Sequence, residues 1–230
     1  WEYKIMSSRI GVDIGGTFTD FICYDESGNK VVIDKIPTTP DAPEKAVIEV
    51  IKRNLTKEHL GKVDFFLHGT TVGLNSLLER KGSKVGLVCT KGFRDILEIR
   101  RGDRDEMYNL FWQPKPPLVP RYLRLEVEER IFASGAIHTP INNIQLKEVC
   151  NKLIEEKVNS IAIALINSYA NKKHEVVIKK TLRELGFKGQ ISLSSIVSGE
   201  YREYERTTTT VIDAFVKTRI SNYLNTLKKE

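Results

Sequence analysis

The sequence predicts an α/β fold, and two observations support this prediction. Short apolar runs typical of buried strands alternate with segments in which apolar residues recur at helical spacing, and this alternation occurs in two rounds along the chain. The 230 residues suffice for one large domain or two small ones, and the apolar fraction of 40% lies in the ordinary range for globular proteins. We therefore expect sheets covered by helices.

The first round of the alternation opens with a predicted β-hairpin. Its two apolar runs are separated by Ile14-Gly15-Gly16-Thr17, which is typical of a tight turn. Prolines then interrupt the strand pattern, and Asp41 is the expected N-cap of a helix whose apolar positions run from Ala46 to Leu55. The strands expected in this round cover residues 9–13, 18–24, 30–36, 63–67 and 84–90.

A turn, two helices and a long loop complete this round. His68-Gly-Thr-Thr71 is expected to be a loop, and the next helix should run from Val72 to Lys81, where Gly82 ends it. Residues 93–99 predict a short helix. From Gly102 to Pro120 the periodic patterns stop and prolines accumulate, which predicts an irregular surface segment.

The second round repeats the alternation. Turn residues Ser134-Gly135 separate two of its strands, so we expect these strands to pair. The last helix carries a long apolar stripe. The expected strands cover residues 123–132, 136–139, 160–166 and 190–193, and the expected helices cover 144–157, 172–185 and 209–228.

The segment Asp13-Ile-Gly-Gly-Thr-Phe-Thr-Asp20 carries the clearest chemical signal. Gly15 and Gly16 lack Cβ atoms, so they can take positive φ and let the backbone approach a ligand closely. Successive backbone N–H groups in such a turn bind anions, and Thr17 and Thr19 add hydroxyl donors.

Asp13 ends the first strand and is placed to hold Mg²⁺ through water, because Mg²⁺ prefers oxygen ligands. The segment therefore predicts a triphosphate cradle; the alternative is a plain hairpin turn. It is not a Walker A loop, because no Gly-Lys-Ser/Thr follows and a strand comes next.

This octapeptide resembles the first phosphate loop of the actin-like ATPases, which include sugar kinases and heat-shock chaperones. The resemblance implies an actin-like ATPase (ribonuclease H-like) first lobe. Such a lobe has a mixed sheet with helices on both faces and opens with a β-hairpin phosphate loop.

Longer segments resemble the hydantoinase A and 5-oxoprolinase family. His68-Gly-Thr-Thr-Val-Gly-Leu-Asn-Ser-Leu-Leu-Glu-Arg-Lys-Gly82 is similar to its HGTT stretch, and Thr90-Lys-Gly-Phe-Arg-Asp-Ile-Leu-Glu-Ile-Arg-Arg101 to its GFRD segment. The likeness spans about residues 9–220. It implies additional or flexible residues at 1–8, an N-terminal family region at 9–206 made of two α/β units (9–120 and 121–206), and the start of a further domain at 207–230.

The resemblance also implies a chemistry. Family members use ATP to phosphorylate the carbonyl oxygen of a lactam or cyclic imide, which drives ring hydrolysis, and relatives apply the step to ketones for carboxylation. It implies ATP and Mg²⁺ as cofactors, a second lobe from the same or a separate chain, and a hydantoinase B-type subunit as partner. The adenine pocket and second phosphate loop belong to that second lobe, so these residues alone should be inactive. Two alternatives remain: part of a subunit of an ATP-dependent acetone/acetophenone-type carboxylase, and a non-catalytic actin-like binding module.

The expected site residues follow from this resemblance and from the loop. Asp13, Asp20 and His68 are the candidate catalytic residues, with Asp13 also the metal ligand. His68 is either a general acid/base or a residue that orients its loop. The expected phosphate contacts are Gly15, Gly16, Thr17, Thr19, Thr70 and Thr71.

Several residues have a structural alternative. Thr70 or Thr71 would also serve as an N-cap. Asn75 is expected to be structural, Arg94 and Asp95 to pair with each other or with other side chains, and Glu205 and Arg206 to form ion pairs at a domain junction. The remaining histidines show no ligand-like pairing in the sequence and are taken as surface or structural residues: His59, His138 and His174.

Charge and composition exclude several classes of function. The net charge is +6, but Lys and Arg are interspersed with Asp and Glu and form no basic stripe with aromatics, which argues against nucleic acid. No apolar run approaches the ~20 residues that span a bilayer. Cys23, Cys89 and Cys150 are far apart and form no CxxC pair, which argues against zinc, and buried free thiols are typical of a cytoplasmic protein.

Overall fold

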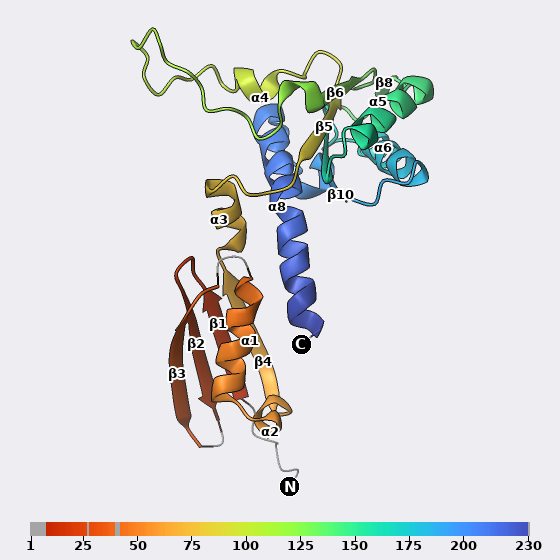
Figure 1. Ribbon diagram of the computed structural model, residues 1–230. Coiled ribbons are helices and arrows are strands. Elements are labelled where there is room, and N and C mark those ends of the chain that lie inside the picture. The colour runs from red at the N-terminus through yellow and green to blue at the C-terminus, as the bar shows by residue number, and fades with distance from the viewer. Residues whose placement is uncertain (1–7, 27, 40–41, 230) are drawn as a thin grey trace. The chain divides into compact units, whose positions relative to one another are not determined.

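The computed structural model of the chain describes residues 8–26, 28–39 and 42–229. Contacts divide the chain into two compact units: residues up to Glu79 together with those from Arg219 onward form the first, and Arg80–Thr218 form the second. Each unit is built on one four-stranded sheet (Figure 1). The sequence regions 9–120 and 121–206 stay a prediction; the compact units divide the chain at Glu79.

The first unit contains a mixed sheet. β1 and β2 form the predicted hairpin, β3 continues it antiparallel, and β4 lies parallel to β1. The strand order is therefore β3-β2-β1-β4. The strands cover Ser8–Ile14 (β1), Phe18–Asp25 (β2), Lys30–Pro37 (β3) and Val63–Thr70 (β4).

Helix α1 (Pro43–Asn54) covers one face of this sheet. Ala46, Val47 and Val50 on the helix pack with Ile10 and Phe21 of the strands in one buried core. Pro43 occupies the first turn, where a proline is tolerated because its missing N–H would have no helical partner. The expected N-cap, Asp41, lies outside the described residues. The short helix α2 (Lys57–Leu60) precedes β4.

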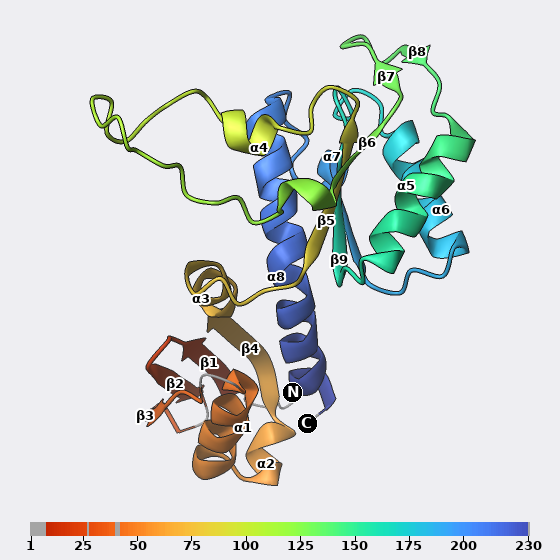
Figure 2. The same ribbon diagram turned by 45° about the horizontal axis from the view of Figure 1, so that its top comes forward.

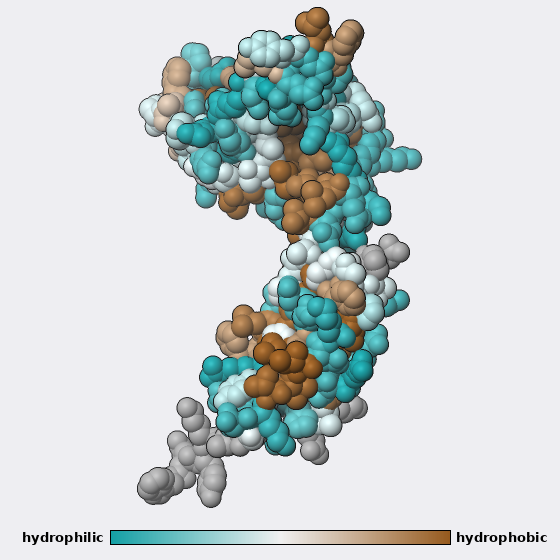
Figure 3. Space-filling view, turned by 90° about the vertical axis from the view of Figure 1, so that its left-hand side faces the viewer, coloured by the Kyte–Doolittle hydropathy of each residue, from teal (hydrophilic) through white to brown (hydrophobic). Residues whose placement is uncertain are grey.

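The other face of this sheet is open within the described residues. Ile33 of β3 is 76% exposed, and Phe65 and Leu67 of β4 are also exposed. Figure 3 shows apolar side chains gathered on the side of this unit where β3 lies. Along β2, exposed residues of this open face alternate with buried residues of the core from Phe18 to Cys23.

The second unit contains a parallel sheet with the order β10-β9-β5-β6. Helices α5 and α6 lie on one side of this sheet and α8 on the other (Figure 2). Ser160 on β9 donates to the carbonyl of Ala214 on α8 at 2.7 Å. Helices on both faces explain why every residue of β5 and β9 is buried.

These elements have the following bounds. The strands are β5 (Val85–Thr90), β6 (Arg124–Val127), β9 (Ser160–Ala164) and β10 (Gln190–Leu193), with a separate small pair, β7 (Arg130–Ile131) and β8 (Ile137–Thr139). The helices are α3 (Val72–Leu78, in the first unit), α4 (Ile96–Ile99), η1 (Arg121–Leu123), α5 (Asn143–Glu155), α6 (Lys173–Glu184), α7 (Ser194–Val197) and α8 (Glu203–Lys229).

Two expectations near His68 were wrong. β4 continues through Thr70, so residues 68–70 are strand and not loop, because they pair with β1. Helix α3 ends at Leu78, before the expected end at Lys81. Gly82 is not its cap: a Cβ there would lie 2.3 Å from Cε1 of Phe215, so packing against α8 requires a glycine.

The expected strand over 123–132 is interrupted. β6 ends at Val127 and β7 begins at Arg130, because the side chain of Glu129 turns into the interior of the second unit. The pairing of β7 with β8 confirms the predicted turn at 134–135. Helix α8 begins at Glu203, ahead of the predicted start at Thr209. No helix in the described part of the chain is long and apolar enough to cross a membrane.

Candidate functional site

The glycine turn between β1 and β2 forms the centre of the candidate site. Gly15 donates its backbone N–H to the carbonyl of Phe18 at 2.9 Å, and Thr38 donates to the carbonyl of Thr17 at 2.9 Å. Within the described residues, the N–H groups of Gly16 and Thr17 donate to no protein acceptor. Both residues are exposed, so the tip of the hairpin is open to a ligand.

The two glycines do not take positive φ, which corrects the sequence expectation, and a side chain at either position would meet a close neighbour. The glycines with positive φ in the described chain are Gly92, Gly102, Gly135 and Gly186. A Cβ on Gly15 would lie 3.1 Å from the carbonyl oxygen of Phe18, and one on Gly16 would lie 3.3 Å from Nδ2 of Asn75. The turn therefore packs closely against its own backbone and against α3.

Asn75 is thus closer to the loop than the sequence indicated. Its Nδ2 donates to Oγ1 of Thr71 at 3.3 Å, and Oγ1 of Thr71 donates to the carbonyl of Ile14 at 3.1 Å. These contacts join α3 to the end of β1, beside Gly16. Asn75 was expected to be structural, and the spacing in the sequence could not show that α3 folds back onto the glycine turn.

Two carboxylates lie side by side next to this turn. Asp13 and Asp20 are paired across β1 and β2, and both are exposed on the open face of the sheet. Nζ of Lys35 lies 3.0 Å from Oδ1 of Asp20. Asp13 is also paired with Gly69 on β4, where a Cβ would lie only 2.7 Å from Oδ1 of Asp13. Gly69 therefore leaves room for the Asp13 carboxylate, a role that depends on strand register.

The surface beside these carboxylates is hollowed. A depression of about 520 Å³ is lined by Asp13, Asp20 and Gly69 at its polar end and by apolar side chains such as Ile22 and Leu67 elsewhere. Within the described residues there is no group of three His, Cys, Asp or Glu side chains that would hold a metal alone. Magnesium bound to a nucleotide needs only one or two carboxylates with phosphate and water, so Asp13 and Asp20 fit that requirement.

His68 is not brought together with these carboxylates, because it points from the opposite face of the sheet. Its Nδ1 lies 3.2 Å from the carbonyl oxygen of Val12, and its Nε2 contacts the hydroxyl of Tyr223 on α8. Burial lowers the pKa of His68, against a smaller opposing effect of its bond to Val12 and of the nearby Asp13 charge. The two nitrogens of a neutral ring are therefore both occupied, which favours an orienting role over acid–base chemistry.

The expected threonine contacts divide between the turn and the core. Thr17 is exposed at the turn, but Thr19 is fully buried and its hydroxyl lies 2.9 Å from that of Thr38. Oγ1 of Thr70 accepts from the first backbone N–H of α3, that of Val72, at 3.1 Å. Thr71 binds Ile14, as described above. The N-cap position of α3 is that of Thr71, whose side chain makes no cap hydrogen bond, and Thr70 instead binds the first turn. Thr17 therefore has the hydroxyl most open to a ligand.

Arginine–carboxylate pairs of the second unit are structural. Asp95 pairs with Arg121 and not with Arg94, through contacts of 2.8 and 2.9 Å, and these bonds hold the pKa of Asp95 below its usual value. Glu205 pairs with Arg101 at 2.5 Å, which confirms an ion pair there. The expected ion pair of Arg206 was wrong: within the described residues this buried guanidinium makes no ion pair and donates to the carbonyl oxygens of Leu165 and Glu200 at 2.9 and 2.6 Å.

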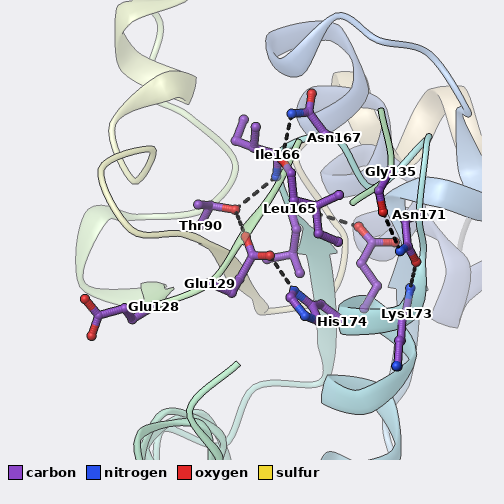
Figure 4. A network of polar contacts seen from close by, with 12 residues as sticks. Thr90, Glu128, Glu129, Gly135, Leu165, Ile166, Asn167, Asn171, Lys173 and His174 are labelled. Carbon is purple, nitrogen blue, oxygen red and sulfur yellow. Dashed lines mark hydrogen bonds and ion pairs between the residues drawn. The ribbon is translucent and has the colours of Figure 1, made fainter. Parts of the chain in front are cut away.

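His174 departs from the expectation that the remaining histidines lack a carboxylate partner. It is buried, and its Nδ1 lies 2.7 Å from Oε2 of Glu129, whose Oε1 accepts from Thr90. Figure 4 shows Glu129 pointing into this network while the adjacent Glu128 points away from it. His138, by contrast, is exposed and packs against Phe132 with ring centroids 4.7 Å apart.

The three cysteines are free and buried, as the sequence indicated. Burial raises the pKa of Cys89 to about 12 and that of Cys150 to about 11. Such thiols are protonated at neutral pH, so neither is an activated nucleophile.

Comparison with known proteins places this geometry in a family. Residues 9–186 match the family described as the hydantoinase/oxoprolinase N-terminal region. The chain is 38% identical over 223 residues to a protein of Methanocaldococcus jannaschii, 34% identical over 224 residues to caprolactamase subunit alpha of Pseudomonas jessenii, and 33% identical over 235 residues to the acetophenone carboxylase gamma subunit of Aromatoleum aromaticum. These alignments cover 96%, 94% and 94% of the chain, respectively, and 32% of each relative.

A solved structure agrees with the sequence comparison. The crystal structure of the ATP-dependent caprolactamase of Pseudomonas jessenii superposes with a TM-score of 0.83 at 33% identity, over 96% of this chain and 33% of that one. The fold is thus an α/β lobe of the actin-like ATPase type, and the chain spans about a third of the length of the relatives it matches. With its glycine turn and paired carboxylates on that lobe, the chain belongs to the hydantoinase/oxoprolinase family.

Proposed function

We propose that this chain is the N-terminal, phosphate-binding part of an ATP-dependent enzyme that phosphorylates the carbonyl oxygen of a lactam or cyclic imide to drive ring hydrolysis. The observation that carries the proposal is the exposed glycine turn, in which two backbone N–H groups have no protein acceptor within the described residues, next to the carboxylates of Asp13 and Asp20. The similarity to an ATP-dependent caprolactamase supports the choice of a lactam as substrate.

The proposed chemistry solves a problem of reactivity. An amide is a poor electrophile, and phosphorylation of its oxygen makes that oxygen a good leaving group. ATP would supply the phosphoryl group, and Mg²⁺ held beside the phosphates would neutralise part of their charge. The N–H groups of Gly16 and Thr17 and the hydroxyl of Thr17 would bind phosphate oxygens, while Asp13 would hold Mg²⁺ through water and Asp20 would add negative charge beside it.

The complete site requires more protein than these residues. The chain spans about a third of the length of its relatives. We therefore propose that a second lobe supplies the adenine pocket and second phosphate loop, and that a hydantoinase B-type subunit completes the enzyme. The chain alone would then be inactive.

A ketone carboxylase is the second candidate, because the acetophenone carboxylase gamma subunit is nearly as similar to the chain as the caprolactamase subunit is. Both would use the same phosphate loop, so the loop cannot distinguish them. A non-catalytic actin-like module is the third candidate.

The test uses the complete protein with its partner subunit. It is incubated with ATP and Mg²⁺ and with hydantoin, 5-oxoproline or caprolactam, or with acetone and bicarbonate, and phosphate release is measured. The proposal expects release stimulated by a cyclic amide. Stimulation by the ketone alone would show a carboxylase, and no stimulation by any of these compounds would support the non-catalytic module.

A further inference from the structure

The contact between His68 and Tyr223 links strand β4 to the last helix, α8. Tyr223 is 3% exposed and belongs to the same buried core as Ile10 and Val12 of β1. Its hydroxyl contacts Nε2 of His68, and the rings lie with centroids 5.5 Å apart. Nδ1 of His68 lies 3.2 Å from the carbonyl oxygen of Val12, the residue before Asp13.

The donor and the acceptor in each of these hydrogen bonds follow from the chemistry of the groups. A carbonyl oxygen only accepts, so Nδ1 of His68 carries a proton and donates a hydrogen bond to the carbonyl oxygen of Val12. In the neutral ring Nε2 then has a lone pair, and the Tyr223 hydroxyl donates to it. Burial raises the pKa of Tyr223, with a smaller effect of the Glu44 charge, so the hydroxyl keeps its proton. Asp13 is the charged group that acts on His68.

We propose that Tyr223 is a positioning residue for the phosphate site: by donating to Nε2, it fixes the orientation of the His68 ring, whose Nδ1–H in turn holds the carbonyl of Val12 in β1. The inference rests on the proposed function for its meaning. Asp13 follows Val12 directly, and its side chain leaves the sheet on the other face. A fixed Val12 carbonyl therefore fixes the backbone from which the Asp13 carboxylate projects.

Removal of the hydroxyl has a defined consequence. Tyr223→Phe keeps the ring in the core but leaves Nε2 without its donor at a half-buried position. The Val12 carbonyl still selects the Nδ1–H form, but the ring loses the bond that fixes its orientation, so its hydrogen bond to Val12 is held less firmly. On the sheet face that α1 covers, β1 then has a weaker contact at Val12.

The test reads the ring directly in the 230-residue chain labelled with ¹⁵N. Long-range ¹H–¹⁵N spectra report which ring nitrogen is protonated, and His68→Gln identifies the signals of His68. We expect the wild-type ring to be wholly Nδ1–H. Tyr223→Phe should keep this form but shift the Nε2 signal, because Nε2 no longer accepts a hydrogen bond, together with the amide signals of Val12 and Asp13. A wild-type Nε2–H ring, or unchanged signals in Tyr223→Phe, would overturn the proposal.

Tyr24→Phe is the matched control. It removes a hydroxyl that donates to Oδ1 of Asn29 at 3.1 Å in an exposed turn of the same unit, so the His68 signals should stay unchanged. A change in His68 of the same size in this variant would show a general loss of structure and would also overturn the positioning role.

A second measurement separates this inference from the proposed function. In the complete protein, Tyr223→Phe should lower ATP-dependent phosphate release roughly fivefold to tenfold, the effect of one hydrogen bond. His68→Asn, which keeps a donor toward Val12, should retain more activity than His68→Leu. A changed ring with unchanged phosphate release would refute the positioning role alone. If the wild type releases no phosphate, the proposed function fails, and the ring spectra still decide whether Tyr223 holds His68.

Discussion

Asp13 and Asp20 face each other across the hairpin, and each is exposed at the polar end of the hollow described above. Their positions follow from the alternation of a two-stranded ladder, in which paired residues point to the same side. At this scale the important distinction is between groups open to a ligand and groups already bound within the protein. Asp13 and Thr17 belong to the first class, and Thr19 and His68 belong to the second.

Substitution of Asp13 tests the magnesium role. In the complete enzyme, Asp13→Asn should lower ATP-dependent turnover by roughly 10²–10³, or about 3–4 kcal/mol, because charge on the transferred phosphoryl group loses part of its neutralisation. The melting temperature should stay close to that of the wild type, since the side chain is exposed. His138→Ala, at an exposed position of the second unit, is the control and should be silent in both measurements. Wild-type turnover in Asp13→Asn would exclude the metal role.

Gly69 gives a second test of the same carboxylate without removing its charge. Gly69→Ala places a Cβ 2.7 Å from Oδ1 of Asp13, so the flexible carboxylate must move away. We expect a clear loss of ATP-dependent turnover with little change in melting temperature. Gly199→Ala is the matched control, since a Cβ there meets nothing within 4 Å. Equal turnover of the two variants would show that the position of the Asp13 carboxylate is unimportant.

At the scale of elements, β5 and β9 mark the place where the parallel sheet changes direction. From β5 the chain continues toward β6 on one side, and from β9 it continues toward β10 on the other. Ligands of open α/β sheets bind at the carboxyl ends of such strands. Here that place is filled: Oγ1 of Thr90, at the end of β5, accepts from the N–H of Ile166 at 3.0 Å and donates to the buried Glu129 (Figure 4). The polar groups at this switch point are therefore bonded to one another.

Thr90→Val tests whether this buried network stabilises the sheet. Valine keeps the shape but removes the hydroxyl, so the N–H of Ile166 and one oxygen of Glu129 lose their partner. We expect a loss of roughly 2–3 kcal/mol in the free energy of unfolding, measured by urea denaturation. Thr226→Val, at a solvent-accessible position of α8, should change it by no more than about 0.5 kcal/mol. A similar effect in both variants would show that the network contributes little.

At the scale of the whole molecule, the two units differ in how completely they enclose their sheets. The parallel sheet has helices on both faces, whereas the described residues cover only one face of the mixed sheet. The open face carries Ile33, Phe65 and Leu67, which are all more than half exposed. An apolar surface of this kind is typical of a region that contacts other protein. It agrees with the small share of the relatives' length that the chain spans.

Nucleotide affinity tests the two-lobe proposal. The 230-residue chain offers phosphate donors from one turn and no adenine site among its proposed contacts, so ATP binding should be weak or undetectable by calorimetry with Mg²⁺ present. The complete protein should bind ATP measurably, and this gives the positive control. Micromolar affinity of the chain by itself would contradict a nucleotide site shared between two lobes.

Local patterns in the sequence determined much of this protein. The hairpin, the alternation of strands and helices, the buried cysteines and the family resemblance all depend on residues close together in the chain, where side-chain periodicity and turn chemistry act directly. The tertiary structure alone decided which of these residues meet. Gly69 lies beside Asp13, Asn75 beside Gly16 and Tyr223 against His68, because strand register and helix packing join segments far apart in sequence. For the same reason the sequence could not show that His68 points away from Asp13.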